Sequence, residues 1–181
     1  MKKLLYFLIF IPVIAFAQQK EEVVSLSGKS AEEMYSKAKE WFALSNNPGN
    51  VTIQVDNPSE QRIIGKGVKN IVFSMQKAPS FIDVYYALSV QFKDGRYKYL
   101  LDVNSIKNEE GYVMSYDDFK LLTTKEGWNA YCQKTGIKPQ SRSKAEVATV
   151  MDVYSLMNKN FDNIIADLTS YLKSDQKEIN W

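Results

Sequence analysis

The stretch from Phe81 to Asn104 constrains the fold of this chain most strongly. It contains two runs in which apolar and polar residues alternate, and this is the period of a half-buried β-strand. The dipeptide Asp94-Gly95 separates the two runs. It favours a two-residue type I′ turn, which needs positive φ at both positions. The sequence therefore predicts a β-hairpin in the middle of a sheet.

The predicted hairpin has one apolar face and one mostly polar face. The apolar face carries Val84, Tyr86, Leu88, Val90 and Phe92 on the first strand and Tyr97, Tyr99, Leu101 and Val103 on the second. The other face carries Asp83, Tyr85, Ala87, Ser89, Gln91, Lys98, Leu100 and Asp102. Antiparallel sheets commonly bury one face and leave the other in water. We therefore expect helices to cover the apolar face only.

Three further strands are expected before the hairpin, over residues 22–27, 51–56 and 62–73. The third contains Gly65 and Gly67. Glycine inside a strand indicates a β-bulge or a close approach of the backbone to another group. Here a bend in a curved sheet is favoured over an approach to a ligand.

A capping box formed by Ser30 and Glu33 predicts the start of a helix that stops at residues 46–49. Its apolar side consists of Met34, Tyr35, Ala38, Trp41 and Phe42. A second capping box, Ser143 with Glu146, opens a long helix at the end of the chain. Its apolar residues follow a 3,4 spacing: Val147, Val150, Tyr154, Met157, Phe161, Ile164, Leu168 and Tyr171.

The 3,4 spacing of the last helix is also typical of a coiled coil. The flanking positions are mostly apolar and lack complementary charges, as at Met151, Ile165 and Leu172. This wide apolar stripe favours packing against a sheet. Between the hairpin and this helix, residues 106–142 form a less regular insertion. In it, a helix is expected to begin at Ser115, and a further short helix to end at Gly136.

The first 17 residues have the pattern of a secretory signal peptide. Two lysines precede an apolar run, and Ala15-Phe16-Ala17 is a cleavage sequence. The alternative is a membrane anchor, but the run is shorter than the ~20 residues that span a bilayer. We expect cleavage after Ala17 and no stable membrane insertion afterwards. Residues 18–181 would then form a single α+β domain that is periplasmic or secreted.

The charges do not favour nucleic acid as a partner. The chain has 23 basic and 21 acidic residues, and removing Lys2 and Lys3 with the signal peptide leaves 21 of each. A neutral chain has no electrostatic footprint for a phosphate backbone. A small buried apolar residue is the favoured interpretation of the single cysteine, Cys132, and a bridge between two chains is the alternative.

Catalysis is not expected from this sequence. It contains no histidine, which excludes a Ser-His-Asp triad and the commonest zinc ligand. Asp117 and Asp118 are adjacent on a predicted helix and would point apart, so they make a poor acid–base pair. No phosphate-binding or dinucleotide-binding glycine motif occurs. We expect no catalytic residues, no metal and no cofactor.

The predicted elements follow the order β-α-β-β-β-β-α, which indicates an α+β fold with an antiparallel sheet of about five strands and helices on one face. Four segments carry a resemblance: SAEEMYSKAKEWF, RIIGKGV, YYALSVQFKDGRYKYLLDV and the closing helix. Together they resemble an exported bacterial family, a domain of unknown function with a TATA-binding-protein-like fold. The resemblance covers Val23 to Asn104 and, more loosely, the last helix. It implies a curved sheet with helices on its convex side, and it implies no activity.

The expected function is an exported binding module of the bacterial envelope, which uses the polar sheet face for a peptide, a glycan or a protein partner. The candidate binding residues are Tyr85, Lys98, Arg96, Asp83, Gln91, Asp102 and Gln54. The simpler interpretation is a solvated sheet face. Strand addition at an open sheet edge is another route to a partner. A structural or assembly role is the alternative function, with Tyr112, Trp128 and Tyr131 as a possible apolar patch.

Overall fold

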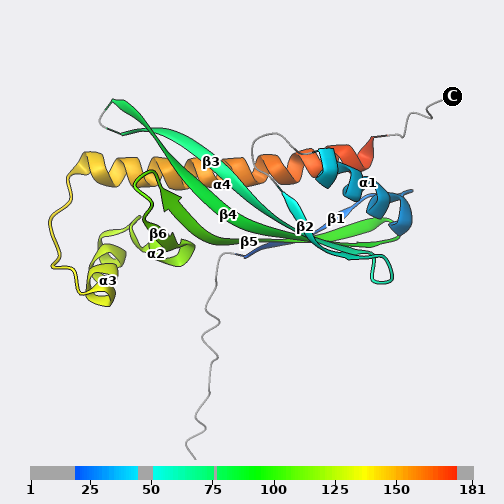
Figure 1. Ribbon diagram of the computed structural model, residues 1–181, viewed down its shortest axis with the longest axis horizontal. Coiled ribbons are helices and arrows are strands. Elements are labelled where there is room, and N and C mark those ends of the chain that lie inside the picture. The colour runs from blue at the N-terminus through cyan, green and yellow to red at the C-terminus, as the bar shows by residue number, and fades with distance from the viewer. Residues whose placement is uncertain (1–18, 45–50, 76, 175–181) are drawn as a thin grey trace, which may run out of the picture.

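The computed structural model describes residues 19–44, 51–75 and 77–174. Within these residues the chain forms six strands and four helices. The sheet is antiparallel, and its long strands bend and twist along their length (Figure 1). The expected α+β class is confirmed, with one short strand more than expected. The predicted signal peptide, residues 1–17, and the predicted helix stop at 46–49 lie outside the described residues.

The strands of the sheet lie in the order β1-β5-β4-β3-β2, and β6 pairs with β5. Their bounds are β1 (Gln19–Ser25), β2 (Thr52–Asn57), β3 (Arg62–Met75), β4 (Ala78–Lys93), β5 (Arg96–Asn108) and β6 (Val113–Ser115). The predicted central hairpin is β4–β5, and it lies between β3 and β1. The first strand of the domain therefore crosses over to pair with the fifth.

The β4–β5 turn has the predicted length but a different type. Lys93 pairs with Arg96, which leaves Asp94 and Gly95 as a two-residue loop. Gly95 has a φ of 74°, whereas Asp94 is not among the described residues with positive φ. The type I′ prediction is therefore wrong. Only glycine adopts the left-handed backbone conformation without steric cost, and in this turn Gly95 is the residue that adopts it.

All four helices have defined bounds: α1 (Ala31–Leu44), α2 (Tyr116–Leu121), α3 (Lys125–Thr135) and α4 (Lys144–Lys173). In Figure 1, α4 runs along the length of the molecule and the long strands cross it obliquely. The predicted apolar side of α1 is buried, as is the apolar face of the hairpin from Val84 to Leu101. Trp41 Nε1 of α1 donates to Asp167 of α4 at 2.8 Å. These two helices therefore seal the apolar sheet face together.

The buried stripe of α4 differs from the predicted one. Its buried residues are Val153, Met157, Phe161, Ile165, Leu168 and Leu172. Five of the eight predicted seam positions are only partly buried: Val147, Val150, Tyr154, Ile164 and Tyr171. A straight helix turns once every 3.6 residues, so a strict seven-residue repeat drifts by ~20° per heptad around it. The residues that face the sheet therefore advance mainly in steps of four.

Regular strand structure extends beyond the predicted end of the hairpin. Tyr86 pairs with Val103 and Tyr85 with Ser105, so Asn104 is the extra residue of a β-bulge. The bulge shifts the alternation by one position, and Ile106 is again buried. Because the alternation is interrupted at Asn104, the sequence pattern did not predict that β5 continues beyond it. The expected helix starts and stops are confirmed at Ser115, Ser143 and Gly136.

Gly65 and Gly67 make room for side chains of the protein itself. A Cβ on Gly65 would lie 2.7 Å from atoms of Phe42 and Val51, and one on Gly67 would lie 2.7 Å from the ring of Tyr86. A β-bulge in β2 lies opposite, between Ile53 and Val55. The close approach is therefore present, to side chains of the protein itself, whereas the bulge lies in β2 and not in the strand that carries the two glycines.

The fold also bears on two smaller expectations. Cys132 is a free thiol whose side chain has no exposed surface, which agrees with the expected buried role. None of the helices in the described part of the chain combines the length and the apolar character needed to cross a bilayer.

Candidate functional site

The sheet surface that faces away from α1 and α4 is called the open face below. Side chains alternate strictly along β4, so every second residue lies on this face. The open-face residues of β4 are exposed or half-buried, at Asp83, Tyr85, Ala87, Ser89 and Gln91. Their neighbours on the other face, Val84, Tyr86, Leu88, Val90 and Phe92, are all buried. The predicted division into a sealed face and an accessible face is therefore confirmed.

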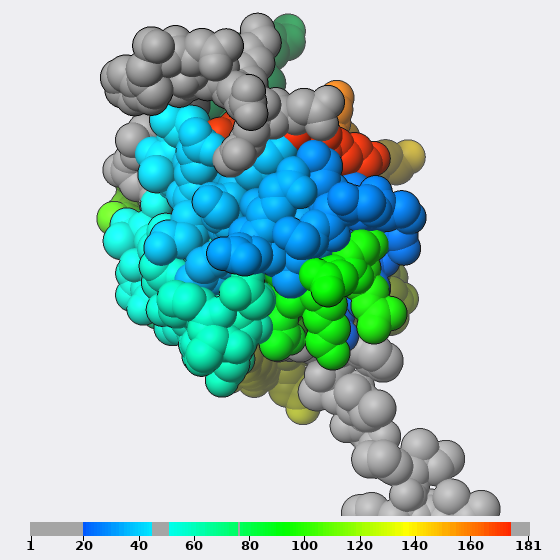
Figure 2. All heavy atoms as spheres, turned by 90° about the vertical axis from the view of Figure 1, so that its right-hand side faces the viewer, coloured from blue at the N-terminus to red at the C-terminus, as the bar shows by residue number. Residues whose placement is uncertain are grey.

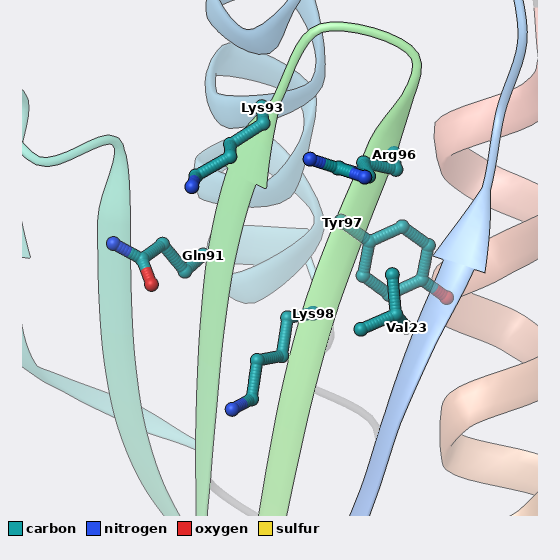
Figure 3. A pocket seen from close by; sticks show the side chains of 6 residues that line it. All are labelled: Val23, Gln91, Lys93, Arg96, Tyr97 and Lys98. Carbon is teal, nitrogen blue, oxygen red and sulfur yellow. The ribbon is translucent and has the colours of Figure 1, made fainter.

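A shallow hollow of about 210 Å³ lies on this side of the sheet, beside the β4–β5 turn. Its lining residues are Val23, Gln91, Lys93, Arg96, Tyr97 and Lys98. We call it the basic hollow. Figure 3 shows Gln91, Lys93 and Lys98 reaching out from the β4–β5 ribbon, whereas the ring of Tyr97 belongs to the core and is 1% exposed. The polar lining therefore consists of three cations and one amide.

The acidic residues near the basic hollow are already engaged. Glu21 on β1 pairs with Lys98. The carboxylate of Asp94, in the turn itself, accepts the backbone N–H of Ala31 at 2.9 Å. Among the described residues, Lys93 and Arg96 have no acidic partner. The hollow therefore carries a net positive charge.

A second hollow, of about 440 Å³, lies farther along the open face. Its lining residues are Thr52, Gln54, Lys66, Gly67, Val68, Tyr85, Tyr86, Asn104 and Ser105. We call it the central hollow. The ring of Tyr86 itself lies on the sealed side of the sheet, edge-to-face with Phe161, and burial there raises the pKa of Tyr86 to about 12. The central hollow thus offers hydrogen-bonding groups, one lysine and the ring of Tyr85.

The structure divides the predicted binding residues between these two hollows. Gln91, Arg96 and Lys98 line the basic hollow, and Gln54 and Tyr85 line the central hollow. The other two predicted residues, Asp83 and Asp102, line neither of the two hollows. Asp83 instead accepts a hydrogen bond from Asn70 Nδ2 at 3.0 Å.

Tyr85 and Lys98 do not share a hollow. Lys98 pairs with Gln91, which lies six positions from Tyr85 along β4. At about 3.3 Å per residue, the two side chains are separated by roughly 20 Å along the strand. One small ligand therefore cannot contact both, although an elongated ligand can.

Sequence reasoning missed three polar residues that line these hollows: Lys93, Asn104 and Ser105. Lys93 lies two residues after Gln91 on β4, so the two-residue period of the strand already placed it on the open face. Asn104 and Ser105 reach the central hollow because of the β-bulge in β5. No simple sequence pattern marks that bulge.

The predicted apolar patch in the insertion is not continuous. Trp128 and Tyr131 stack on each other with ring centroids 6.0 Å apart, and Trp128 also lies under the Arg142 guanidinium at 4.9 Å. Tyr112 is 75% exposed in the connection between β5 and β6. No group of acidic residues and cysteine that could hold a metal ion occurs in the described part of the chain.

Comparison with known proteins identifies the family of the sheet. Residues 21–107 match the model of a family described as a domain of unknown function (DUF4468) with a TBP-like fold. The match to the DUF4468 family model thus covers slightly less than half of the 181 residues. The matched residues run from β1 to the end of β5 and include both hollows, whereas α2, α3 and α4 lie outside them. The family named by the sequence resemblance is thus confirmed for its fold.

Two solved structures resemble this chain over most of its length. A DUF4468 family protein from Bacteroides ovatus ATCC 8483 superposes with a TM-score of 0.59 at 16% identity, covering 88% of each chain. A TBP-like protein from Parabacteroides distasonis ATCC 8503 gives a TM-score of 0.56 at 11% identity, covering 87% of this chain and 94% of the other. At these identities the likeness concerns the fold alone. A comparison with curated proteins found no match.

Proposed function

We propose that this protein is an exported, non-catalytic binding module of the bacterial envelope. Its open face would hold an elongated peptide, glycan or protein segment. The observation that carries the proposal is the contrast between the two sheet faces. One face is sealed by α1 and α4, and the other presents two separate hollows on a rigid antiparallel sheet.

The lining of the hollows supports a polar polymer as the ligand. The central hollow combines Gln54, Lys66 and Ser105 with the ring of Tyr85. Hydroxyl, amide and aromatic groups together are suited to sugar rings and to peptide backbone. A ligand that spans roughly 20 Å along β4 would reach the basic hollow as well.

Two-dimensional NMR with isotope-labelled protein tests this proposal against a panel of oligosaccharides and peptides. A bound ligand should shift amide signals of β3, β4 and β5 around the two hollows. Tyr85→Ala should weaken that binding about tenfold through loss of the ring contact. The matched control is Tyr112→Ala, which removes an exposed tyrosine away from the hollows and should bind normally. Shifts confined to α2, α3 and α4, or normal binding by Tyr85→Ala, would contradict the proposal.

The proposed export has its own test. Residues 1–17 have a basic start, an apolar run and an Ala-Phe-Ala cleavage sequence. After expression in a Gram-negative host, mass spectrometry of the periplasmic fraction should find a chain that begins at Gln18. Recovery of the chain only from the cytoplasm, with Met1 to Ala17 still attached, would count against export.

A structural or assembly role is the second candidate, and the outer part of the β3–β4 ribbon favours it. Strand β2 pairs with β3 only from Arg62 to Lys66. Within the described residues, the rest of β3 has a strand neighbour on one side only. Val72 is 63% exposed and its cross-strand partner Phe81 is 39% exposed. Exposed apolar edges of this kind allow strand addition by another chain.

Size-exclusion chromatography with light scattering separates the two candidates. An assembly role predicts self-association at high concentration that Val72→Lys abolishes. The matched control is Ser74→Lys, which adds the same charge at the next open-face position. A monomer at every concentration counts against assembly through identical chains.

A further inference from the structure

The basic hollow indicates the charge of the ligand. We propose that it binds an oxyanion, a carboxylate or a phosphate group, carried by the ligand of the open face. This inference rests on the proposed function and adds a chemical class to it. The other hollow, which is larger and less charged, would take the uncharged part of the same ligand.

Acidic side chains of the described residues compensate only part of the charge of the basic hollow. Lys93, Arg96 and Lys98 line one hollow together with a single amide, that of Gln91. Only Lys98 has an acidic partner among the described residues. Like charges held side by side repel one another, and an anion bound between them removes that repulsion.

The backbone that carries these cations is held in place by hydrogen bonds to the neighbouring segment. The segment between β1 and α1 holds the β4–β5 turn through two backbone hydrogen bonds, from Leu26 N to Gly95 O and from Gly95 N to Lys29 O, each 2.8 Å. Figure 2 faces this end of the molecule and shows the green turn against the blue α1 segment. The bond from Ala31 N–H to Asp94 also turns that carboxylate towards α1. A backbone held in this way lowers the entropy lost on binding.

A further cation lies in the neighbouring strand β3. Arg62 on β3 pairs in register with Gln91, which pairs in register with Lys98. Arg62 is partly balanced by Glu60, at 3.5 Å between Nε and the carboxylate. The row Arg62, Gln91 and Lys98 extends the positive surface from the basic hollow across the sheet.

The size and geometry of the hollow favour a single oxyanion. At about 210 Å³ it is smaller than the roughly 300–1,000 Å³ of sites that hold a complete small molecule. An arginine guanidinium matches the two oxygens of a carboxylate or a phosphate, and lysines add point charges. The hollow is therefore suited to one acidic group of a longer ligand.

NMR titrations with defined acidic probes and their neutral counterparts test the inference. The probes are inorganic phosphate, tri-glutamate against tri-glutamine, and tri-galacturonate against its methyl ester, all at constant ionic strength. The test variant is Lys93→Gln/Arg96→Gln. If this double variant fails to fold, Lys93→Glu takes its place. The matched control, Lys144→Gln/Lys159→Gln, removes two exposed charges from α4. Equal unfolding midpoints verify that the compared variants are folded.

At least one acidic probe should give saturable shifts in the amides of residues 91–98. Its affinity should exceed that of the neutral counterpart, should fall about tenfold in the test variant and should be unchanged in the control. The probe that binds most tightly identifies the source of the oxyanion as phosphate, peptide or glycan. Equal binding of acidic and neutral probes, or normal binding by the test variant, overturns the inference.

The two proposals fail in different ways. In one outcome, a neutral probe shifts the amides around Tyr85 and binds the Lys93/Arg96 variant with unchanged affinity. This result supports the open face as a binding surface but overturns the oxyanion site. The absence of saturable shifts anywhere on the open face, with acidic and neutral probes alike, counts against both.

Discussion

At the scale of single residues, Lys37 shows how the structure uses a charge that the sequence pattern does not single out. Its side chain is 2% exposed, although it lies on an amphipathic helix where lysine is usually solvated. Its ammonium group donates to the backbone carbonyl of Ser174 at the end of α4. A cation at a helix C-terminus binds carbonyls that lack intrahelical partners. Lys37 therefore joins α1 to the last turn of α4.

Replacing Lys37 with methionine tests this contact. The variant keeps most of the apolar stem and loses the charge-assisted hydrogen bond, which should lower the free energy of unfolding by about 1–3 kcal/mol. Urea denaturation measures the change. Lys159→Met on the exposed side of α4 is the control and should change stability by less than about 0.5 kcal/mol. Equal effects of the two substitutions would show that the Ser174 contact contributes nothing.

Gly67 is the second residue with a specific steric role. A methyl group there would lie 2.7 Å from the ring of Tyr86, which is 4% exposed and packs edge-to-face on Phe161. Because that ring cannot move freely, Gly67→Ala should destabilise the protein by about 1–3 kcal/mol. Thermal unfolding should show a lower midpoint, whereas Ser89→Ala on the open face should leave it nearly unchanged. A Gly67→Ala variant as stable as the parent would refute the steric argument.

At the scale of elements, the contact between α1 and β2 depends on the ionisation of Asp56. Its carboxylate pairs with Lys39 Nζ at 2.6 Å and also accepts the hydroxyl of Tyr35. The hydrogen bond from Lys39, followed by that from Tyr35, holds the pKa of Asp56 below its ordinary value. Burial and the adjacent carboxylate raise the pKa of Tyr35 to about 12.

The sign of the pH dependence follows from the lowered pKa of Asp56. A carboxyl group with a lower pKa in the folded state contributes stability above its unfolded pKa and loses it as the pH falls through its folded pKa. Asp56→Asn should therefore be less stable than the parent at neutral pH, and the difference should shrink under acid conditions. Urea denaturation over an acidic pH series measures it. Asp152→Asn, at an exposed position of α4, is the control. A difference that does not change with pH would contradict this account.

The sequence predicted local elements better than their pairing. The Asp94-Gly95 hairpin and the Ser143 cap were identified because each depends on residues close together in the chain. The pairing of β1 with β5 depends on contacts between residues far apart in the chain, such as Val23 and Lys98, and no local pattern encodes it.

The candidate site was predictable only in part. Period-two alternation placed Gln91 and Lys98 on the accessible face, and the same period would have added Lys93. The division into two hollows depends on the length of β4 and on the bulge at Asn104. The engagement of Asp94 by α1, which leaves the basic hollow positive, required the tertiary structure.

At the scale of the whole molecule, the account depends on an asymmetric sheet. Helices α1 and α4 cover one face with a continuous apolar core, and the open face carries polar and charged side chains in water. Both binding proposals require the open face to be accessible in the folded protein. Because successive side chains of a strand point to opposite faces of the sheet, residues of β4 alone can test whether the open face is accessible.

Cysteine labelling on β4 is the most direct test. In a Cys132→Ala background, Gln91→Cys and Val84→Cys place one thiol on each face of the same strand. The account predicts that a thiol reagent labels Cys at position 91 in the native protein at nearly the rate measured in urea, and labels position 84 only after unfolding. Slow labelling at position 91, or native labelling at position 84 as fast as at position 91, would contradict the account.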